Sequence, residues 1–269
     1  MNQLKQRIKN HPVISSILVL LLAILCTEVT KDKGQVWYYS IGAITQFCFA
    51  GALIILLKYL DLYKTAGISS PRSWKQVWLI APLLIYCYIN GESFFTGELH
   101  INASLGLWSL FIIHYISVGV FEEMVCRSTI MNLMLHKWGN TRMGIYKSVL
   151  LSSLIFGLAH LTNLIYGRGD LLSVSCQIIY AIFFGVFFGA CMIRNGSVIP
   201  AMIMHAFFDI CGNFSDLKSK SNFIAIHQTS LEGAILVILM LLPMFLYGLF
   251  ILRKADLHNT LLHKNDTID

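Results

Sequence analysis

Long apolar blocks are the feature that most limits what this chain can fold into. The blocks are about 16 to 25 residues long, close to the roughly 20 residues that a helix rising about 1.5 Å per residue needs to cross a hydrocarbon core of about 30 Å. Hydrophobic residues make up 56% of the 269 residues and charged residues only 13%, whereas soluble domains are about 25% charged. The expected fold class is all-α, a polytopic transmembrane helix bundle.

We expect eight spans in a single transmembrane bundle over residues 1–254, followed by a polar C-terminal tail over residues 255–269. The spans are Val13 to Val29, Val36 to Leu57, Val77 to Ile89, Ser104 to Met134, Lys147 to Tyr166, Leu171 to Met192, Val198 to Asn213 and Leu231 to Leu252. A porin-type barrel is excluded, because its strands would alternate apolar and polar residues.

Basic residues predict the orientation of the bundle, because short cytoplasmic loops collect Lys and Arg. With an even number of spans, fourteen of the 20 basic residues lie on the side of the N-terminus and five on the other, while Arg127 lies inside a span. Both termini are therefore predicted to be cytoplasmic. The net charge of +6 does not indicate a nucleic-acid partner, because these residues are spread along the chain rather than clustered.

Ionisable residues inside the fourth, fifth and seventh spans are the candidate functional residues. The segments read Glu122-Glu123-x-x-x-Arg127, Phe156-x-x-x-His160 and His205-x-x-x-Asp209. Residues four apart share a helix face, so Glu123 can pair with Arg127, while Glu122 points about 100° away and is left free. A charge at the bilayer centre costs about 2.5–3.5 kcal/mol on insertion scales, and such residues usually serve function.

Counting from the predicted cytoplasmic ends puts Glu122, His160 and His205 at similar depths. A water-filled pocket that opens to the cytoplasm would bury them together. The alternative is a structural network, in which the histidines form interhelical hydrogen bonds and the Glu-Arg pair fixes helix register. His114 is assigned to structure, because no acid lies at helical spacing from it and it is nearer the outer end of its span.

Glu122, His160, His205 and Asp209 supply the groups that amide hydrolysis needs. These are a base for water, a proton donor for the leaving amine and hydrogen-bond donors for the oxyanion. The sequence contains no HExxH, GxSxG, Walker A or GxGxxG motif, so zincin, α/β-hydrolase and nucleotide-binding interpretations have no support.

These three motifs, in this order and spacing, resemble the CPBP intramembrane proteases, also called the Abi or CAAX-processing and bacteriocin-processing family, which is related to type II CAAX prenyl endopeptidases. The resemblance implies a catalytic core over about residues 104–213 and an enzyme that hydrolyses peptide bonds. It implies that Glu122 and His160 activate water, that His205 and Asp209 hold the oxyanion, and that Glu123, Arg127 and Phe156 support the site.

Asp209 departs from those family members that have Asn at this position, because an ionised carboxylate would repel an oxyanion. Asp209 is therefore protonated, orients His205, or ligates a metal. We favour a site without a cofactor. The alternative is Zn²⁺ held by His160, His205, Glu122 and Asp209, since all four are plausible zinc ligands.

The resemblance implies a membrane-associated peptide or protein substrate in the lipid bilayer, with peptide maturation or bacteriocin immunity as the setting. We expect a multi-pass protein of the bacterial plasma membrane whose active site opens to the cytoplasmic side. Two other classes stay open. One is a catalytically idle immunity or scaffold protein, and the other is an ion-coupled transporter that uses the buried Glu and His residues.

Overall fold

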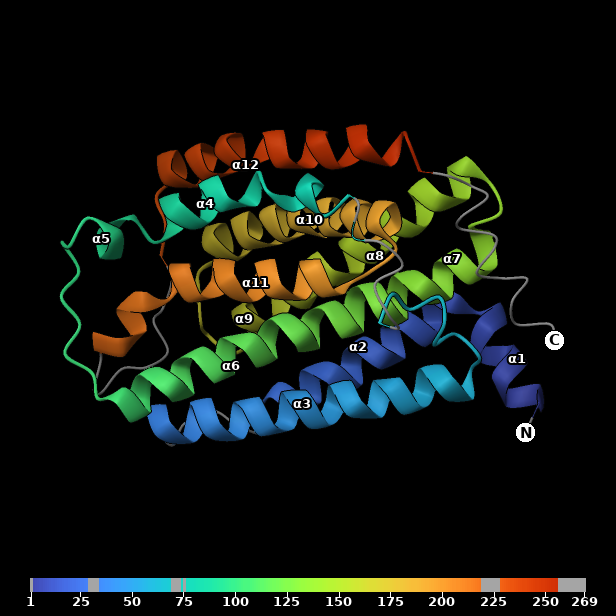
Figure 1. Cartoon of the computed structure of the whole chain (residues 1–269), viewed down its shortest axis with the longest axis horizontal. Coiled ribbons are helices and arrows are strands. Elements are labelled where there is room, and N and C mark those ends of the chain that lie inside the picture. Colours follow the sequence, from blue (N-terminus) through green and yellow to red (C-terminus); the bar gives the residue numbers. More distant parts are fainter. Residues whose placement is uncertain (1, 29–33, 69–73, 75, 219–227, 256–269) are drawn as a thin grey trace.

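The computed structural model describes residues 2–28, 34–68, 74, 76–218 and 228–255. Its long helices run along one axis of the molecule (Figure 1), and the part described contains helices but no strands, which confirms the all-α fold class. The helices are α1 (Asn2–Asn10), α2 (Pro12–Glu28), α3 (Gln35–Tyr59), η1 (Val77–Ile80), α4 (Leu83–Asn90), α5 (Glu92–Phe95), α6 (Leu105–Glu123), η2 (Met124–Met131), α7 (Asn132–Trp138), α8 (Arg142–Ala159), α9 (Leu161–Ile165), α10 (Leu171–Asn195), α11 (Ile199–Gly212), η3 (Phe214–Lys218) and α12 (Leu231–Leu252).

All eight apolar segments predicted from the sequence are helical, but they differ in length. Among the residues described, five helical segments are long and apolar enough to cross a membrane: Gln35–Tyr59, Leu105–Trp138, Arg142–Ile165, Leu171–Asn195 and Leu231–Leu252. A sixth is a pair of helices, Gln3–Asn10 and Pro12–Glu28, bent by 95°. Val77–Asn90 and Ile199–Gly212 are apolar but shorter. The chain is thus an integral membrane protein, and eight spans with cytoplasmic termini stay a prediction.

Side chains at the helix starts explain several boundaries. Ser104, Thr141, Asp170 and Ser230 each accept a hydrogen bond from the backbone N–H three residues further on, at the starts of α6, α8, α10 and α12. This is how N-cap residues satisfy donors that have no partner within the helix. At its other end α10 stops at Gly196, whose φ of 70° lies in the left-handed region that favours glycine.

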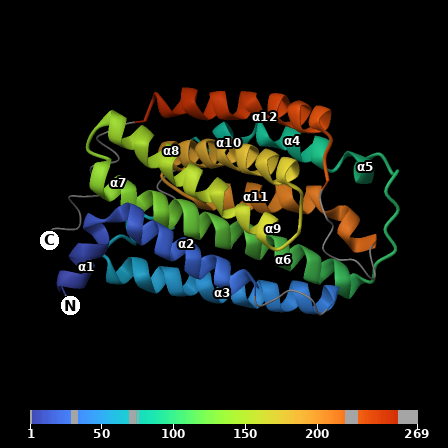
Figure 2. The same ribbon diagram turned by 180° about the vertical axis from the view of Figure 1, so that it is seen from behind.

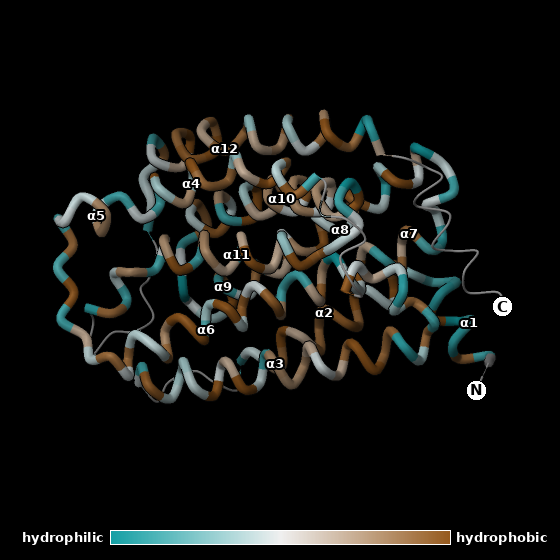
Figure 3. Tube along the Cα trace, viewed as in Figure 1, coloured by the Kyte–Doolittle hydropathy of each residue, from teal (hydrophilic) through white to brown (hydrophobic). Residues whose placement is uncertain are grey.

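Helix α10 lies at the centre of the bundle. In the most apolar stretch of α10, 61% of the residues are buried inside the protein, whereas the corresponding share in α12 is 28%. Views from both sides place α8, α11 and α12 around it (Figures 1 and 2). Apolar colour dominates the long helices, whereas α1 is mostly hydrophilic (Figure 3). Many large apolar side chains on the outside of the bundle are exposed, for example Leu18, Ile55 and Leu236, as expected of surfaces that face lipid.

Glycines let two helix pairs approach closely. A Cβ on Gly185 of α10 would lie 2.7 Å from Cβ of Ser153 on α8. A Cβ on Gly119 of α6 would lie 2.7 Å from the backbone oxygen of Met202 and the backbone nitrogen of Ala206 on α11. Small residues at helix contacts are typical of membrane bundles. The α6–α11 approach is what brings the acids of α6 beside the His of α11.

The predicted polar tail begins at Ala255, which is buried. Residues 256–269, the rest of that predicted segment, lie outside the part of the chain that the structure describes.

Candidate functional site

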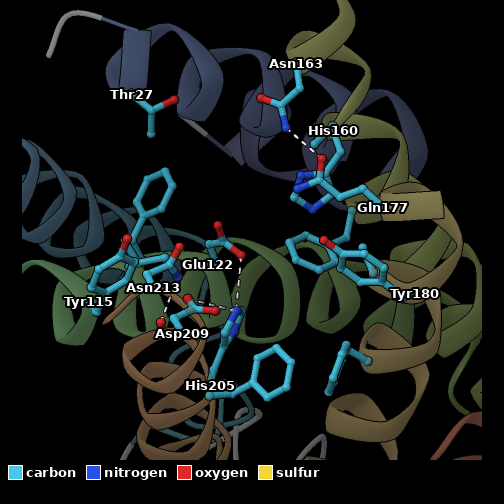
Figure 4. Close-up of a pocket in the computed structure, with 18 of the residues that line it drawn as sticks. Thr27, Tyr115, Glu122, His160, Asn163, Gln177, Tyr180, His205, Asp209 and Asn213 are labelled. Atoms are coloured by element: carbon cyan, nitrogen blue, oxygen red, sulfur yellow. Dashed lines mark hydrogen bonds and ion pairs between the residues drawn. The ribbon is translucent and has the colours of Figure 1, made fainter. Parts of the chain in front are cut away.

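A cavity of about 770 Å³ lies among the helices and contains most of the candidate residues. Its lining includes Glu122 from α6, His160 from the junction of α8 and α9, and His205 and Asp209 from α11. Figure 4 shows these side chains around one open space. The three separate sequence motifs therefore meet at one site, as their spacing and depth predicted.

The two adjacent acids of α6 have different surroundings. The side chain of Glu123 is 0% exposed, and its Oε1 atom lies 2.9 Å from a terminal nitrogen of Arg127 and 2.8 Å from Nδ1 of His205. The side chain of Glu122 is 26% exposed and borders the cavity. The predicted ion pair between Glu123 and Arg127 is confirmed, and Glu122 is the acid that faces the cavity.

His205 is held on one side by Glu123 and turns its other nitrogen to the cavity. A carboxylate only accepts hydrogen bonds, so Nδ1 carries the hydrogen in the 2.8 Å contact with Glu123. The Nε2 atom lies 3.5 Å from Oε2 of Glu122 and 3.6 Å from Oδ2 of Asp209. These separations exceed the usual hydrogen-bond range of about 2.7–3.2 Å, so Nε2 keeps the ability to contact another molecule.

Aromatic rings fix the buried Arg127. Its guanidinium lies 4.9 Å from the ring centre of Phe156 and 5.4 Å from that of Phe188. The same two rings support the histidines, since Phe156 packs edge-on against His160 at 5.5 Å and Phe188 stacks on His205 at 5.4 Å. Phe188 is a site residue that the motifs did not reveal. The aromatic run over 183–188 in the most buried helix was the signal that could have found it.

His160 lies across the open space from Glu122 (Figure 4). It follows the last residue of α8 and borders the cavity. Within the part of the chain described, no hydrogen bond or ion pair joins His160 to Glu122, His205 or Asp209. The space between these side chains is therefore where a water molecule or a peptide group could reach both sides of the site.

The helix that carries the acids changes its winding directly after them. Residues Met124–Met131 form a π-helix, in which the hydroxyl of Thr129 donates to the backbone oxygen of Met124 at 2.8 Å. π-Helical turns within α-helices are frequent at functional sites. The sequence predicted one uninterrupted span here, and periodicity gave no indication of the wider turn.

Further polar side chains of the cavity belong to no recognised motif. Asn163 donates from Nδ2 to Oε1 of Gln177 at 2.8 Å beside His160, and the side chain of Asn213 donates to the backbone oxygen of Asp209 at 2.7 Å. Asn163, Gln177 and Asn213 all border the cavity. The sequence gives no signal that these isolated amides share a site, because they are far apart in the chain and come together only when the helices pack.

The candidate zinc ligands do not form a ready metal site in this arrangement. Among the residues described, no group of three or more His, Cys, Asp and Glu side chains is placed to hold a metal ion. A site without a cofactor stays a prediction, and Zn²⁺ held by Glu122, His160, His205 and Asp209 stays the alternative. We derive no chemical step through a metal.

The cavity extends toward the end of the bundle that carries α5. Its lining includes Thr27, Asn90, Arg168 and Asn213. These residues are at or just after the ends of α2, α4, α9 and α11, and these helix ends lie toward α5 (Figure 1). Of these, Asn90 is exposed. The predicted cytoplasmic opening of the site stays a prediction, and it would require termini on the other side of the membrane if the cavity opens at this end. Counting depth from one end alone could not show which end the cavity reaches.

Together, the apolar helices and the enclosed Glu and His side chains define a membrane protein with an intramembrane polar site. The family described as Type II CAAX prenyl endopeptidase Rce1-like matches residues 104–211. The match spans less than half of the 269 residues and includes every candidate site residue. It confirms the resemblance of this segment to a CAAX and CPBP protease-like family. No curated protein and no solved structure was found to match.

Proposed function

We propose that the protein is an intramembrane endopeptidase that cleaves a peptide bond of a membrane-associated peptide or protein with water activated by Glu122. The observation that carries this proposal is the contact of 3.5 Å between Oε2 of Glu122 and Nε2 of His205 at the wall of the cavity. Atoms this close can contact the attacking water and the carbonyl oxygen of the same peptide group, because attack joins both oxygens to one carbon.

In the proposed reaction Glu122 takes a proton from water while the water oxygen bonds to the carbonyl carbon. The carbonyl electron pair moves to oxygen. His205 acts here as the imidazolium, with one hydrogen on Nδ1 toward Glu123 and one on Nε2, and Nε2 donates a hydrogen bond to the oxyanion. The oxyanion then reforms the carbonyl as the carbon–nitrogen bond breaks, and Glu122 returns its proton to the leaving amine. The products are a carboxylic acid and an amine.

The remaining residues have supporting roles in this proposal. His160 positions the water from the opposite wall of the cavity. Glu123 and Arg127 keep Nδ1 of His205 protonated and its ring fixed, through contacts of 2.8 Å and 2.9 Å to the same carboxylate oxygen. Asp209, whose Oδ2 atom is 3.6 Å from Nε2, orients His205. Buried networks of this kind hold reacting groups in one geometry.

For the setting, we propose the bacterial plasma membrane with both termini in the cytoplasm. The distribution of Lys and Arg supports this orientation. The cavity then faces the extracytoplasmic side, and the substrate enters from there or from the membrane. Peptide maturation fits this arrangement. Bacteriocin immunity rests on family resemblance alone, since neither the fold nor the family match supports it.

The test is cleavage of candidate membrane peptides by the purified protein in detergent. We expect Glu122→Gln and His160→Ala to lose at least about a hundredfold in rate, the usual contribution of a general base, while the thermal unfolding temperature stays near that of the wild type. Glu232→Gln is the matched control, because Glu232 is exposed on α12 and does not border the cavity. We expect it to cleave as the wild type does.

Equal cleavage by the wild type and Glu122→Gln would refute the proposal. Adding a metal chelator separates the two possible mechanisms, and we expect unchanged cleavage. Loss of cleavage with chelator, restored by Zn²⁺, would mean that the cavity rearranges around a metal. A catalytically idle scaffold protein and an ion-coupled transporter, the two other classes, would cleave none of the peptides.

A further inference from the structure

The cavity contains a second polar cluster beyond Glu122, toward the end of the bundle that carries α5. We define this outer cluster as Tyr38, His114, Tyr115 and Asp216, all of which border the cavity. The hydroxyl of Tyr115 donates to Oδ2 of Asp216 at 3.0 Å. The ring of His114 lies between those of Tyr38 and Tyr115, with centroid distances of 4.7 Å and 5.2 Å. Aromatic rings and a carboxylate thus face the same space.

His114 indicates that this cluster binds something. The residue is 1% exposed, and its ring nitrogens have no side-chain hydrogen-bond partner among the described residues. Among these residues, the backbone of Tyr39 on α3 is the one polar group recorded against the ring. Leaving a buried polar group unpaired costs about 1–3 kcal/mol. The backbone of Tyr39 can satisfy one of the two nitrogens, which leaves the other without a partner among the described residues. In a neutral imidazole one nitrogen donates and the other accepts, so a polar group brought in by a ligand could satisfy it.

The charge of the cavity indicates which ligands it favours. Among the residues that the structure describes, four carboxylates border it, from Glu28, Glu122, Asp209 and Asp216. Arg168 is the only Lys or Arg among these described lining residues, and Glu28 already binds it through two contacts of 2.6 Å and 3.2 Å. A cleft lined by one sign of charge concentrates ligands of the opposite sign. Aromatic faces next to a carboxylate also attract ammonium and guanidinium groups.

We propose that the outer cluster is a substrate subsite for a positively charged side chain, Lys or Arg, of the peptide that is cleaved. The proposal rests on the proposed function and names its substrate class. The charged group lies against the rings of Tyr38 and Tyr115 on the cavity side and pairs with Asp216. The peptide group beside it reaches His114.

The geometry of α6 sets the distance between this subsite and the bond that is cut. Tyr115 precedes Glu122 by two helical turns, so both are on one helix face and about 10 Å apart along the axis. An extended peptide rises about 3.3 Å per residue. The charged residue is therefore expected about three residues from the scissile bond.

The test measures binding separately from cleavage. The probes are short palmitoylated, fluorescein-labelled peptides that differ only in one central residue, which is Lys, acetyl-lysine or Glu. Binding to the Glu122→Gln variant in detergent is followed by fluorescence anisotropy, so that no peptide is consumed. We expect the Lys peptide to bind about tenfold tighter than the acetyl-lysine peptide, within the range of a desolvated cation–π contact, and the Glu peptide to bind weakest.

Substitutions test whether the outer cluster causes the preference for the Lys peptide. We expect Asp216→Asn and the conservative Tyr115→Phe, each combined with Glu122→Gln, to reduce the advantage of Lys over acetyl-lysine to about twofold or less. The control Glu232→Gln removes one negative charge from an exposed position outside the cavity and should keep the full preference. If Asp216→Asn does not fold, the subsite is still tested in two ways. These are the binding of the three peptides to the Glu122→Gln protein and the effect of Tyr115→Phe on the preference for Lys.

Each result decides one of the two proposals. Equal binding of the Lys and acetyl-lysine peptides, or a preference unchanged by Asp216→Asn and Tyr115→Phe, would overturn the subsite. A Lys preference that disappears in those variants supports it, even if the wild type cleaves none of the peptides. Cleavage with no dependence on charge would leave the endopeptidase proposal standing without this subsite.

Discussion

At the scale of single residues, the site depends on two neighbouring glutamates with opposite surroundings. Successive side chains on a helix point about 100° apart. Glu123 is therefore buried against Arg127 and His205, while Glu122 borders the cavity. This division was predictable from the sequence, since the spacing to Arg127 fits only the second acid. The partnership of Glu123 with His205 was not, because it joins two helices.

The role of Asp209 can be tested by two substitutions. If Asp209 only orients His205, Asn at this position should do the same, because its amide oxygen can occupy the place of Oδ2, 3.6 Å from Nε2. We expect Asp209→Asn to keep cleavage within about tenfold of the wild type and Asp209→Ala to lose about a hundredfold or more, in line with the loss of one positioned polar group. The measurement is kcat/KM on the same membrane peptide. Equal losses in both variants would show that the charge itself is required.

At the scale of helices, the contact between α6 and α11 determines whether the site exists. Glu122 and Glu123 are on α6 and His205 is on α11. The two helices approach closely at Gly119, one turn before the acids. The π-helix that follows the acids then changes the direction of the side chains in the next turns. The hydrophobic pattern predicted neither feature. A glycine in an apolar span can face either lipid or a neighbouring helix, and the pattern is the same in both cases.

A methyl group at Gly119 should separate these helices. Its Cβ would lie 2.7 Å from backbone atoms of Met202 and Ala206, which cannot move independently of α11. We expect Gly119→Ala to lower the stability by about 1–3 kcal/mol, the usual cost of overpacking, and to reduce cleavage at least about tenfold. The control is Gly51→Ala on α3, where nothing lies within 4 Å of the new Cβ. Thermal unfolding in detergent and the cleavage assay measure both effects.

The start of α10 gives a prediction about pH. The backbone N–H of Ser173 donates to the carboxylate of Asp170 at 2.7 Å, and this hydrogen bond lowers the pKa of Asp170. A lowered pKa in the folded state stabilises it above the unfolded pKa of about 3.9, and the stabilisation is lost as the pH falls through the folded value. We expect the unfolding temperature of the wild type to exceed that of Asp170→Asn at neutral pH.

That difference should shrink below about pH 4, because protonated Asp170 resembles Asn there. The measurement is thermal unfolding of both proteins across the pH range, with Glu232→Gln as a second reference. A difference that stays constant on acidification would mean that the charge of Asp170 contributes nothing at this helix start.

At the scale of the whole molecule, orientation in the membrane determines which compartment the site meets. The described ends of the chain lie at one end of the bundle and the cavity extends to the other (Figures 1 and 2). Lys and Arg predict that the termini are cytoplasmic. The cavity is then predicted to be accessible from outside the cell.

Single cysteines test this orientation. Met143 and Glu98 are both exposed and lie at opposite ends of the bundle. In a background in which the exposed Cys48 is replaced by Ser, we expect a membrane-impermeant maleimide to label Glu98→Cys on intact cells and Met143→Cys only after lysis. The reverse pattern would place the termini outside and the cavity on the cytoplasmic side.

The sequence by itself determined the fold class, the helical segments, the residues that bear charge within the apolar helices and the pairing of Glu123 with Arg127. These follow from local rules, since hydropathy and helical spacing act over one or two turns. The tertiary structure decided the partner of His205, the aromatic support of Arg127, the outer cluster around His114 and the end to which the cavity extends. Each depends on how separate helices pack. The residues concerned are far apart in the chain, and local sequence patterns do not indicate which helices contact one another.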